Sequence, residues 1–360
     1  MEPYIVLIGF IFLFWFFSGI YPNPKHNNIF LCLTFIYLYL FCSVRSFEVG
    51  RDVPGYIQMY EKTATVPWSD WDYVYFESGY IALMKICNIA GLSAREFFFV
   101  IYSVILFPIY LFVKKRSPLP LLSVIIYISF QFFVFDLTGL RQAIGMSICM
   151  LAYIVASEKK SMRNLSGFIL LVCLAATFHT SALIFLFAYP VMKMPMNRRM
   201  IIIYCLSAVI CFGLNIACVR TLLTYFDKSQ YDYSSDDSQQ LGFTFVALCL
   251  IAILAVWTCC HTKRQMQNQI KQAANILLAS ICILLLFNGS VLLRSGMYYY
   301  FPMIISIPMY VKSLTDRNLR MIASVGIAIV FLIFFFTRDI YNFDVMPYSI
   351  GTDLYSAYIF

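Results

Sequence analysis

Four polar residues suited to phosphate recognition interrupt an otherwise apolar chain. Arg141 and Gln142 open one apolar run, Arg294 separates two others, and Arg51 begins a long polar segment. A guanidinium group presents planar donors that match phosphate oxygens, and a neighbouring amide can donate beside it. An arginine close to a membrane surface can instead extend toward lipid headgroups. We interpret Arg51, Arg141, Gln142 and Arg294 as candidates for binding a phosphate or diphosphate.

Three further residues are candidates for moving a proton. Histidine is the one side chain with an unperturbed pKa close to neutrality, and His179 breaks a long apolar stretch. Asp52 and Glu77 lie in the same polar segment as Arg51. Each also has an ordinary structural interpretation: a helix-linking turn at His179, a solvated turn at Asp52 and a favourable helix N-terminus at Glu77. The sequence does not rank the three as catalytic groups.

Aromatic side chains accompany these groups. Tyr56, Tyr80 and Trp71 could stack on sugar rings, although aromatic residues also form belts at membrane interfaces. Asp70 and Asp72 flank Trp71 with the Asp-x-Asp spacing of some metal sites, and a bound metal is the less favoured alternative. The favoured prediction is a site with neither a metal nor another cofactor.

The composition requires a membrane protein. Hydrophobic residues make up 61% of the 360 residues, and charged residues only 12%, against about 25% in soluble domains. The apolar runs are continuous and lack the period of two that a membrane barrel shows. The net charge of +8 comes from short basic clusters between these runs, so it does not indicate nucleic-acid binding. The 12 Cys show no zinc or disulfide pattern.

The apolar runs predict an all-α, polytopic bundle of about twelve membrane helices in a single transmembrane domain, residues 1–360. An apolar patch within 77–92 is too short to cross, and we expect it to form an interfacial or re-entrant helix. The predicted spans are residues 4–21, 29–45, 97–113, 119–135, 139–157, 164–178, 181–195, 200–219, 242–260, 274–292, 296–311 and 321–337.

Basic clusters on alternate turns set the orientation, because cytoplasmic turns are enriched in Lys and Arg. This rule places both termini outside, together with loops at 46–96 and 220–241 and a tail at 338–360. All candidate groups named above then fall on the same outer side. Their types and their common side predict one polar cavity that faces outward.

Four short motifs, taken in order, resemble the EpsG family of Wzy-like bacterial polysaccharide polymerases. The resemblance covers most of the chain in length and span pattern, whereas the motifs lie in its first half. They are Gly50-Arg51-Asp52 with Tyr56, Glu77-Ser78-Gly79-Tyr80, Leu140-Arg141-Gln142-Ala143 and His179-Thr180-Ser181-Ala182.

This resemblance implies a metal-independent glycosyltransferase similar to the GT-C group. It would transfer a glycan from undecaprenyl diphosphate to the non-reducing end of a lipid-linked repeat unit, at the periplasmic or exterior face of the bacterial inner membrane. The arginines would stabilise the leaving diphosphate, and Asp52, Glu77 or His179 would act on the acceptor hydroxyl. Implied partners are undecaprenyl-diphosphate-linked oligosaccharides, the lipid bilayer, a chain-length regulator and a flippase, but no nucleic acid.

Two alternatives remain from the sequence. A transporter or flippase of lipid-linked oligosaccharide also has about twelve spans, but its polar site usually lies near the membrane midplane between repeated halves. Another outer-face glycosyltransferase or ligase would share the arginine-rich site and differ in its acceptor.

Overall fold

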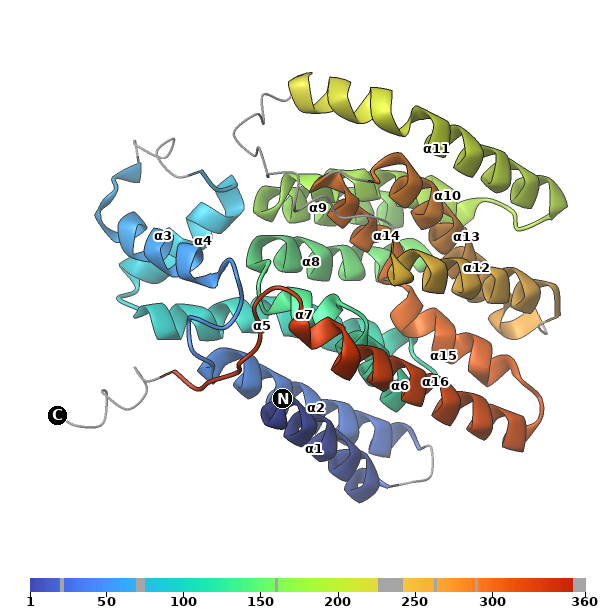
Figure 1. Cartoon of the computed structure of the whole chain (residues 1–360), viewed down its shortest axis with the longest axis horizontal. Helices are drawn as coiled ribbons and strands as arrows, with labels where there is room; N and C mark the ends of the chain where they lie inside the picture. The colour runs from blue at the N-terminus through green and yellow to red at the C-terminus, as the bar shows by residue number, and fades with distance from the viewer. Residues whose placement is uncertain are drawn as a thin grey trace.

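The regular structure is helical throughout the described part of the chain, apart from one isolated bridge between Arg45 and Ile350. Long helices run side by side, and two short ones, α3 (Val53–Thr65) and α4 (Ser78–Ile89), lie at one end of the bundle (Figure 1, left). We call this end the α4 end. The computed structural model describes residues 1–19, 23–68, 75–158, 161–225, 242–261, 264–288 and 291–351.

The helices confirm the predicted membrane bundle. Among the described residues, five segments are long and apolar enough to cross a membrane, and they lie in α2 (Pro24–Val44), α5 (Ala94–Arg116), α8 (Leu140–Ser157), α13 (Arg264–Leu286) and α16 (Arg317–Thr337). Other predicted spans correspond to α1 (Glu2–Ser18), α9 (Met162–Phe178), α11 (Arg198–Tyr225) and α12 (Phe243–His261).

Three predicted spans are broken helices. The predicted span 119–135 consists of α6 (Pro120–Ser129) and α7 (Phe132–Asp136), separated at Gln131, whose φ of 61° is left-handed. The predicted span 181–195 consists of η2 (Thr180–Phe187) and α10 (Ala188–Lys193). The predicted span 296–311 consists of α14 (Met297–Tyr300) and α15 (Met303–Ser313), which follow η5 (Val291–Gly296). Irregular backbone at membrane depth is tolerated where it is buried in protein or lines a polar cavity. The breaks therefore indicate where such a cavity lies.

The segment between α2 and α5 forms more structure than we predicted. The apolar patch within 77–92 is α4, which begins after Glu77 and, at 12 residues, is only about 18 Å long. The preceding helix, α3, is an addition to the prediction. Its buried Val53, Tyr56 and Tyr60 are spaced as one helical face. This spacing could have predicted α3 from the sequence.

One predicted boundary was wrong. The helix predicted at 274–292 begins already at Arg264, because the polar stretch before it is also helical. Within the tail predicted at 338–360, residues 338–351 are folded. After α16 the chain forms η6 (Asp339–Tyr341) and then packs back on the bundle, where Tyr4 Oη donates to the Val345 carbonyl at 2.9 Å.

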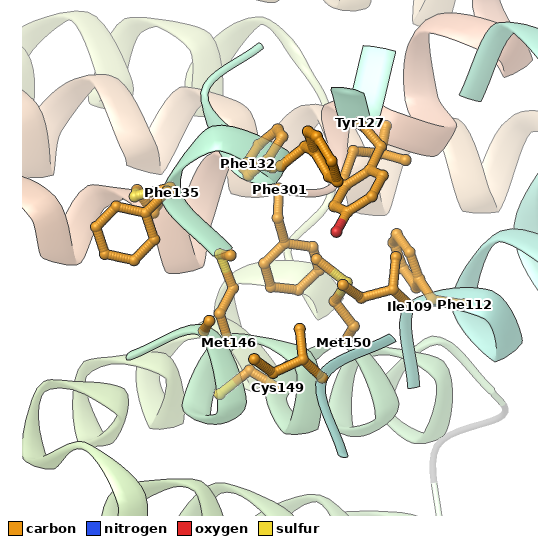
Figure 2. Packing of buried hydrophobic residues seen from close by; sticks show 14 of the residues in the cluster. Ile109, Phe112, Tyr127, Phe132, Phe135, Met146, Cys149, Met150 and Phe301 are labelled. Carbon is orange, nitrogen blue, oxygen red and sulfur yellow. The ribbon is translucent and has the colours of Figure 1, made fainter. Parts of the chain in front are cut away.

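The core is dense in aromatic and sulfur-containing side chains. Figure 2 shows side chains from α5 to α8 meeting Phe301 in one buried cluster. Its labelled members are Ile109, Phe112, Tyr127, Phe132, Phe135, Met146, Cys149, Met150 and Phe301. Because such interiors are close-packed, the helix ends that emerge from this core are held in fixed positions.

A buried arginine joins this core to the α4 end. Arg45 is fully buried and donates to the Val49 and Leu137 carbonyls at 2.8 and 2.5 Å, and to Tyr102 Oη at 2.6 Å. It thereby ties α2 and α5 to the turn that precedes α8. The segment that begins with Gly50 is anchored to this same turn.

We predict that Arg45→Leu lowers the stability of the fold by about 3 kcal/mol or more, because three acceptors would lose a buried charged donor. The measurement is the melting temperature of the purified protein in detergent. Arg198→Leu, at an exposed arginine on α11, is the matched control. Equal melting temperatures for the two variants would contradict this role.

Candidate functional site

A carboxylate at the start of α4 connects an arginine on α8 with a histidine at the end of α9. Arg141 Nη1 donates to Glu77 Oε2 at 2.5 Å, and His179 Nδ1 lies 2.9 Å from Glu77 Oε1. The backbone N–H of Thr180 also donates to Glu77 Oε1, at 3.3 Å. Three of the predicted site residues, far apart in the sequence, therefore form one cluster, which we call the Glu77 cluster.

The local backbone explains this placement. Glu77 is the N-cap of α4, and His179 stands in extended conformation at the point where α9 ends and η2 begins. Gly79 lies so close to α9 that a Cβ there would come within 2.3 Å of Thr177 Oγ1 and 2.9 Å of the Thr177 carbonyl oxygen. Glycine is therefore required for α4 to approach α9 closely enough for Glu77 to reach His179.

The electrostatics keep Glu77 ionised. Burial alone would raise the pKa of its carboxyl, but the hydrogen bond with His179 and the charge of Arg141 outweigh burial and lower the pKa to about 2. An ionised carboxylate can only accept hydrogen bonds, so His179 Nδ1 must be the donor. When the imidazole carries one proton, this arrangement leaves Nε2 as a proton acceptor, as in an oriented general base.

Aromatic rings cover the Arg141 side of the cluster. The Arg141 guanidinium lies 4.3 Å from the Phe76 ring centre and 5.8 Å from that of Tyr56. Tyr80 packs on the same two rings and is fully buried, and Tyr56 is nearly so. Both tyrosines thus shape the arginine site and present little ring surface for stacking on a sugar. Trp71, the third predicted sugar contact, lies outside the described residues.

A polar cavity of about 390 Å³ carries a second group of arginines. Arg51, Arg294 and Arg338 all line it, and we call it the arginine pocket. It forms where the broken helices meet, since Gln131 from the α6–α7 break and Tyr300 from α14 also line it. Two of the four predicted phosphate ligands, Arg51 and Arg294, are therefore in one pocket.

The pocket and the Glu77 cluster are neighbours. Gln142, next to Arg141 on α8, donates through Nε2 to the Arg294 carbonyl at 3.0 Å. Asp52 is close enough to Arg294, Arg51 and Arg141 to interact with all three charges. Even so, burial dominates and raises the pKa of the Asp52 carboxyl. Asp52 therefore lies between the two groups, within the field of three arginines.

The C-terminal segment supplies site residues that we did not predict. Arg338 follows α16 and lines the arginine pocket together with Phe343, whose ring centre is 5.7 Å from the Arg294 guanidinium. Asp344 accepts a hydrogen bond from Arg51 Nε at 3.0 Å. Arg338 lies at the predicted outer end of the last apolar run, as Arg294 lies at the end of an earlier one, and this position could have identified it as a candidate site residue. Nothing in the sequence showed that this segment folds back.

The sequence motif that could suggest a metal cannot be placed. Asp70 and Asp72 lie outside the described residues. Within the described ranges, no three His, Cys, Asp or Glu side chains are grouped so that they could hold a metal ion. The cationic groups that line this site are the arginine side chains.

The lowered pKa of Glu77 predicts a pH-dependent contribution to stability. Because the folded-state pKa lies below the ordinary 4.5, ionised Glu77 stabilises the fold above pH 4.5, by about 2 kcal/mol, and this is lost as the pH falls toward 2. The melting temperature of wild type should therefore exceed that of Glu77→Gln above pH 4.5 and converge with it in acid. Exposed Glu61, substituted to Gln, is the control. A difference independent of pH would refute the assignment.

The close approach at Gly79 gives a second prediction. Gly79→Ala should push α4 away from Thr177 and break the contact between Glu77 and His179, without unfolding the bundle. The tautomer of His179, read by nitrogen NMR in labelled protein, should lose its fixed Nδ1–H form. Gly55→Ala on α3 meets open space and is the control. An unchanged His179 spectrum in Gly79→Ala would show that the close approach does not position Glu77.

Comparison with known proteins gives one informative result. Neither the curated proteins nor the solved structures searched contain a match to this chain. A family model matches residues 28–350, a range that includes every member of the Glu77 cluster and of the arginine pocket. The family that the four motifs suggested is thereby confirmed, and it points to a polysaccharide-related polymerase in a membrane. The chain belongs to the EpsG family.

Proposed function

We propose that this protein is a polysaccharide repeat-unit polymerase. It transfers a glycan from undecaprenyl diphosphate to the non-reducing end of a second lipid-linked unit. The observation that carries this proposal is the adjacency of two groups: a carboxylate-oriented histidine and a pocket lined by three arginines. The first suits an acceptor hydroxyl and the second suits a diphosphate.

The proposed reaction breaks the bond between the anomeric carbon of the donor sugar and the diphosphate oxygen. The oxygen keeps the electron pair, so negative charge grows on the leaving diphosphate. Arg294, Arg51 and Arg338 offset this charge in the pocket, and Arg141 does so from the Glu77 cluster. The acceptor hydroxyl oxygen forms the new bond to the anomeric carbon, and its proton passes to His179 Nε2.

This assignment gives the three acid–base candidates different roles. His179 is the base, because Glu77 holds its Nδ1–H and leaves Nε2 as the acceptor. Glu77 is a positioning residue, since a pKa of about 2 makes it too weak a base near neutrality. Asp52 orients the surrounding arginines or the acceptor. The arginines supply the positive charge that a metal supplies in other transferases, so we expect activity to survive chelation of divalent ions.

The orientation of the bundle supports an exterior site. Lys114–Arg116 end α5 at the end opposite α4, where Arg116 pairs with Glu158 after α8 and Lys193 donates to the Glu158 carbonyl at 2.8 Å. Basic clusters of this kind face the cytoplasm. We therefore propose that the α4 end faces the periplasm or cell exterior, in a bacterial inner membrane. A flippase and a chain-length regulator would be natural partners there.

We predict that His179→Ala lowers the polymerisation rate by about 10²-fold or more, and that Arg294→Ala lowers it by a comparable factor. The assay uses purified protein in nanodiscs with a lipid-linked repeat unit and resolves products by chain length. Both variants should accumulate single units, whereas Arg199→Ala, at an exposed arginine of the opposite end, should give the wild-type ladder.

Two outcomes would overturn the proposal. A full ladder from both variants would remove these residues from the chemistry. Absence of any ladder from the wild-type protein, combined with movement of labelled lipid-linked units across the bilayer, would indicate a flippase instead.

A further inference from the structure

A long apolar groove of about 900 Å³ starts beside the Glu77 cluster. Its walls come from α2 and α9, through Ile36 and Leu174, and its floor comes from α5 and α8, through Ser103 and Ile148. Within the described structure α2 packs on α5, α5 on α8 and α8 on α9, whereas α2 and α9 remain apart. The groove is the space that this separation leaves along the bundle.

The groove runs from the α4 end toward the opposite end of the bundle. At the α4 end it is lined by Phe178, the residue directly before His179. On α5 it runs from Tyr102 to Tyr110, about 12 Å along the helix toward the middle of the bundle. An apolar chain lying in it would therefore enter from the depth of the membrane and end beside the catalytic histidine.

The lining is accessible as well as apolar. Phe107, Ile36 and Leu174 are 61%, 53% and 48% exposed, and Ser103 is exposed on the floor between them. Exposed apolar side chains are ordinary on a membrane protein, so exposure alone identifies no ligand. Here the exposed residues form the walls of a concave groove that ends at Phe178, next in the chain to His179.

We propose that this groove binds the polyprenyl chain of the donor substrate. The inference rests on the function proposed above, because only the donor has its lipid one diphosphate away from the reacting carbon. A diphosphate that spans the arginine pocket and Arg141 lies beside His179, which places the first isoprene units near Phe178, from which the polyprenyl chain follows α9 toward its N-terminus. The acceptor lipid is separated from its reacting sugar by the whole repeat unit, so it has no comparable requirement.

The polyprenyl chain moves from lipid into an equally apolar groove, so this transfer contributes little hydrophobic free energy to donor binding. Its contribution is positional: a chain packed along α9 fixes the direction from which the diphosphate approaches the arginines. Donors with a long polyprenyl chain should therefore react faster than donors with a short one. That preference should depend on the groove.

The test fills the groove and compares two donors. The donors carry the same repeat unit on undecaprenyl diphosphate or on a diphosphate with a short chain of two isoprene units. Ser103→Phe and Leu174→Trp should lower the long-to-short ratio of kcat/KM by about tenfold relative to wild type. Two variants are used so that a folding defect in one does not decide the result.

Matched controls exist on the lipid-facing surface. Ser166 is exposed on α9 outside the groove and, like Ser103, donates to a carbonyl of its own helix. Leu13 on α1 is as exposed as Leu174, at 48%. Ser166→Phe and Leu13→Trp should keep the wild-type ratio.

The outcomes separate this inference from the proposed function. If wild type extends glycans and the filled variants keep its ratio, the groove does not hold the donor chain. If the filled variants lose activity equally with both donors, the groove has a structural role or holds a bulk phospholipid, and the inference also fails. If wild type extends glycans from neither donor, the proposed function itself is wrong.

Discussion

The site depends on one partly buried carboxylate. Glu77 accepts from Arg141 on one oxygen and from His179 and the Thr180 backbone on the other. Its side chain is 18% exposed, so both contacts form largely out of water and each is stronger than its surface equivalent. Without this charge the arginine would lose its anionic partner and the imidazole its fixed tautomer. The same carboxylate therefore orients the proposed base and holds the arginine proposed to contact phosphate beside it.

The bundle interrupts its helices next to these groups. Gln131, η2 and η5 each mark an irregular point in the predicted spans, and residues at two of these points, Gln131 and Arg294, line the arginine pocket. The interruptions free backbone polar groups, and local contacts satisfy them: the Gln131 N–H, for example, donates to Asp339 Oδ2 at 2.7 Å. Polar chemistry and irregular backbone therefore occur together, because each requires a protein-lined cavity in the membrane.

Much of this was predictable from the sequence. Apolar runs predicted the helices. Polar interruptions on one side of the membrane predicted that Arg141, His179 and Arg294 share one polar cavity. Other features depend on tertiary contacts that periodicity does not encode. Glu77 and His179 are 102 residues apart and meet only because Gly79 lets α4 approach α9. From the sequence, Gln131 was assigned to one continuous apolar span and Arg338 to the start of an outer tail, and neither assignment could show the left-handed turn or the fold back onto the bundle. Tyr80 was predicted as a sugar contact, but its complete burial could not be known before α3 and Phe76 were placed.

In the proposed mechanism Glu77 acts on the reaction through His179, and a double-mutant cycle measures this coupling. The measured quantity is kcat/KM for glycan extension in Glu77→Gln, His179→Ala and the double variant. Because Glu77 also holds Arg141, the double variant can fall below His179→Ala, but if Glu77 orients the histidine the combined loss should stay well below the product of the two single losses. Independent roles would instead multiply the two losses, and that result would exclude an action of Glu77 through His179.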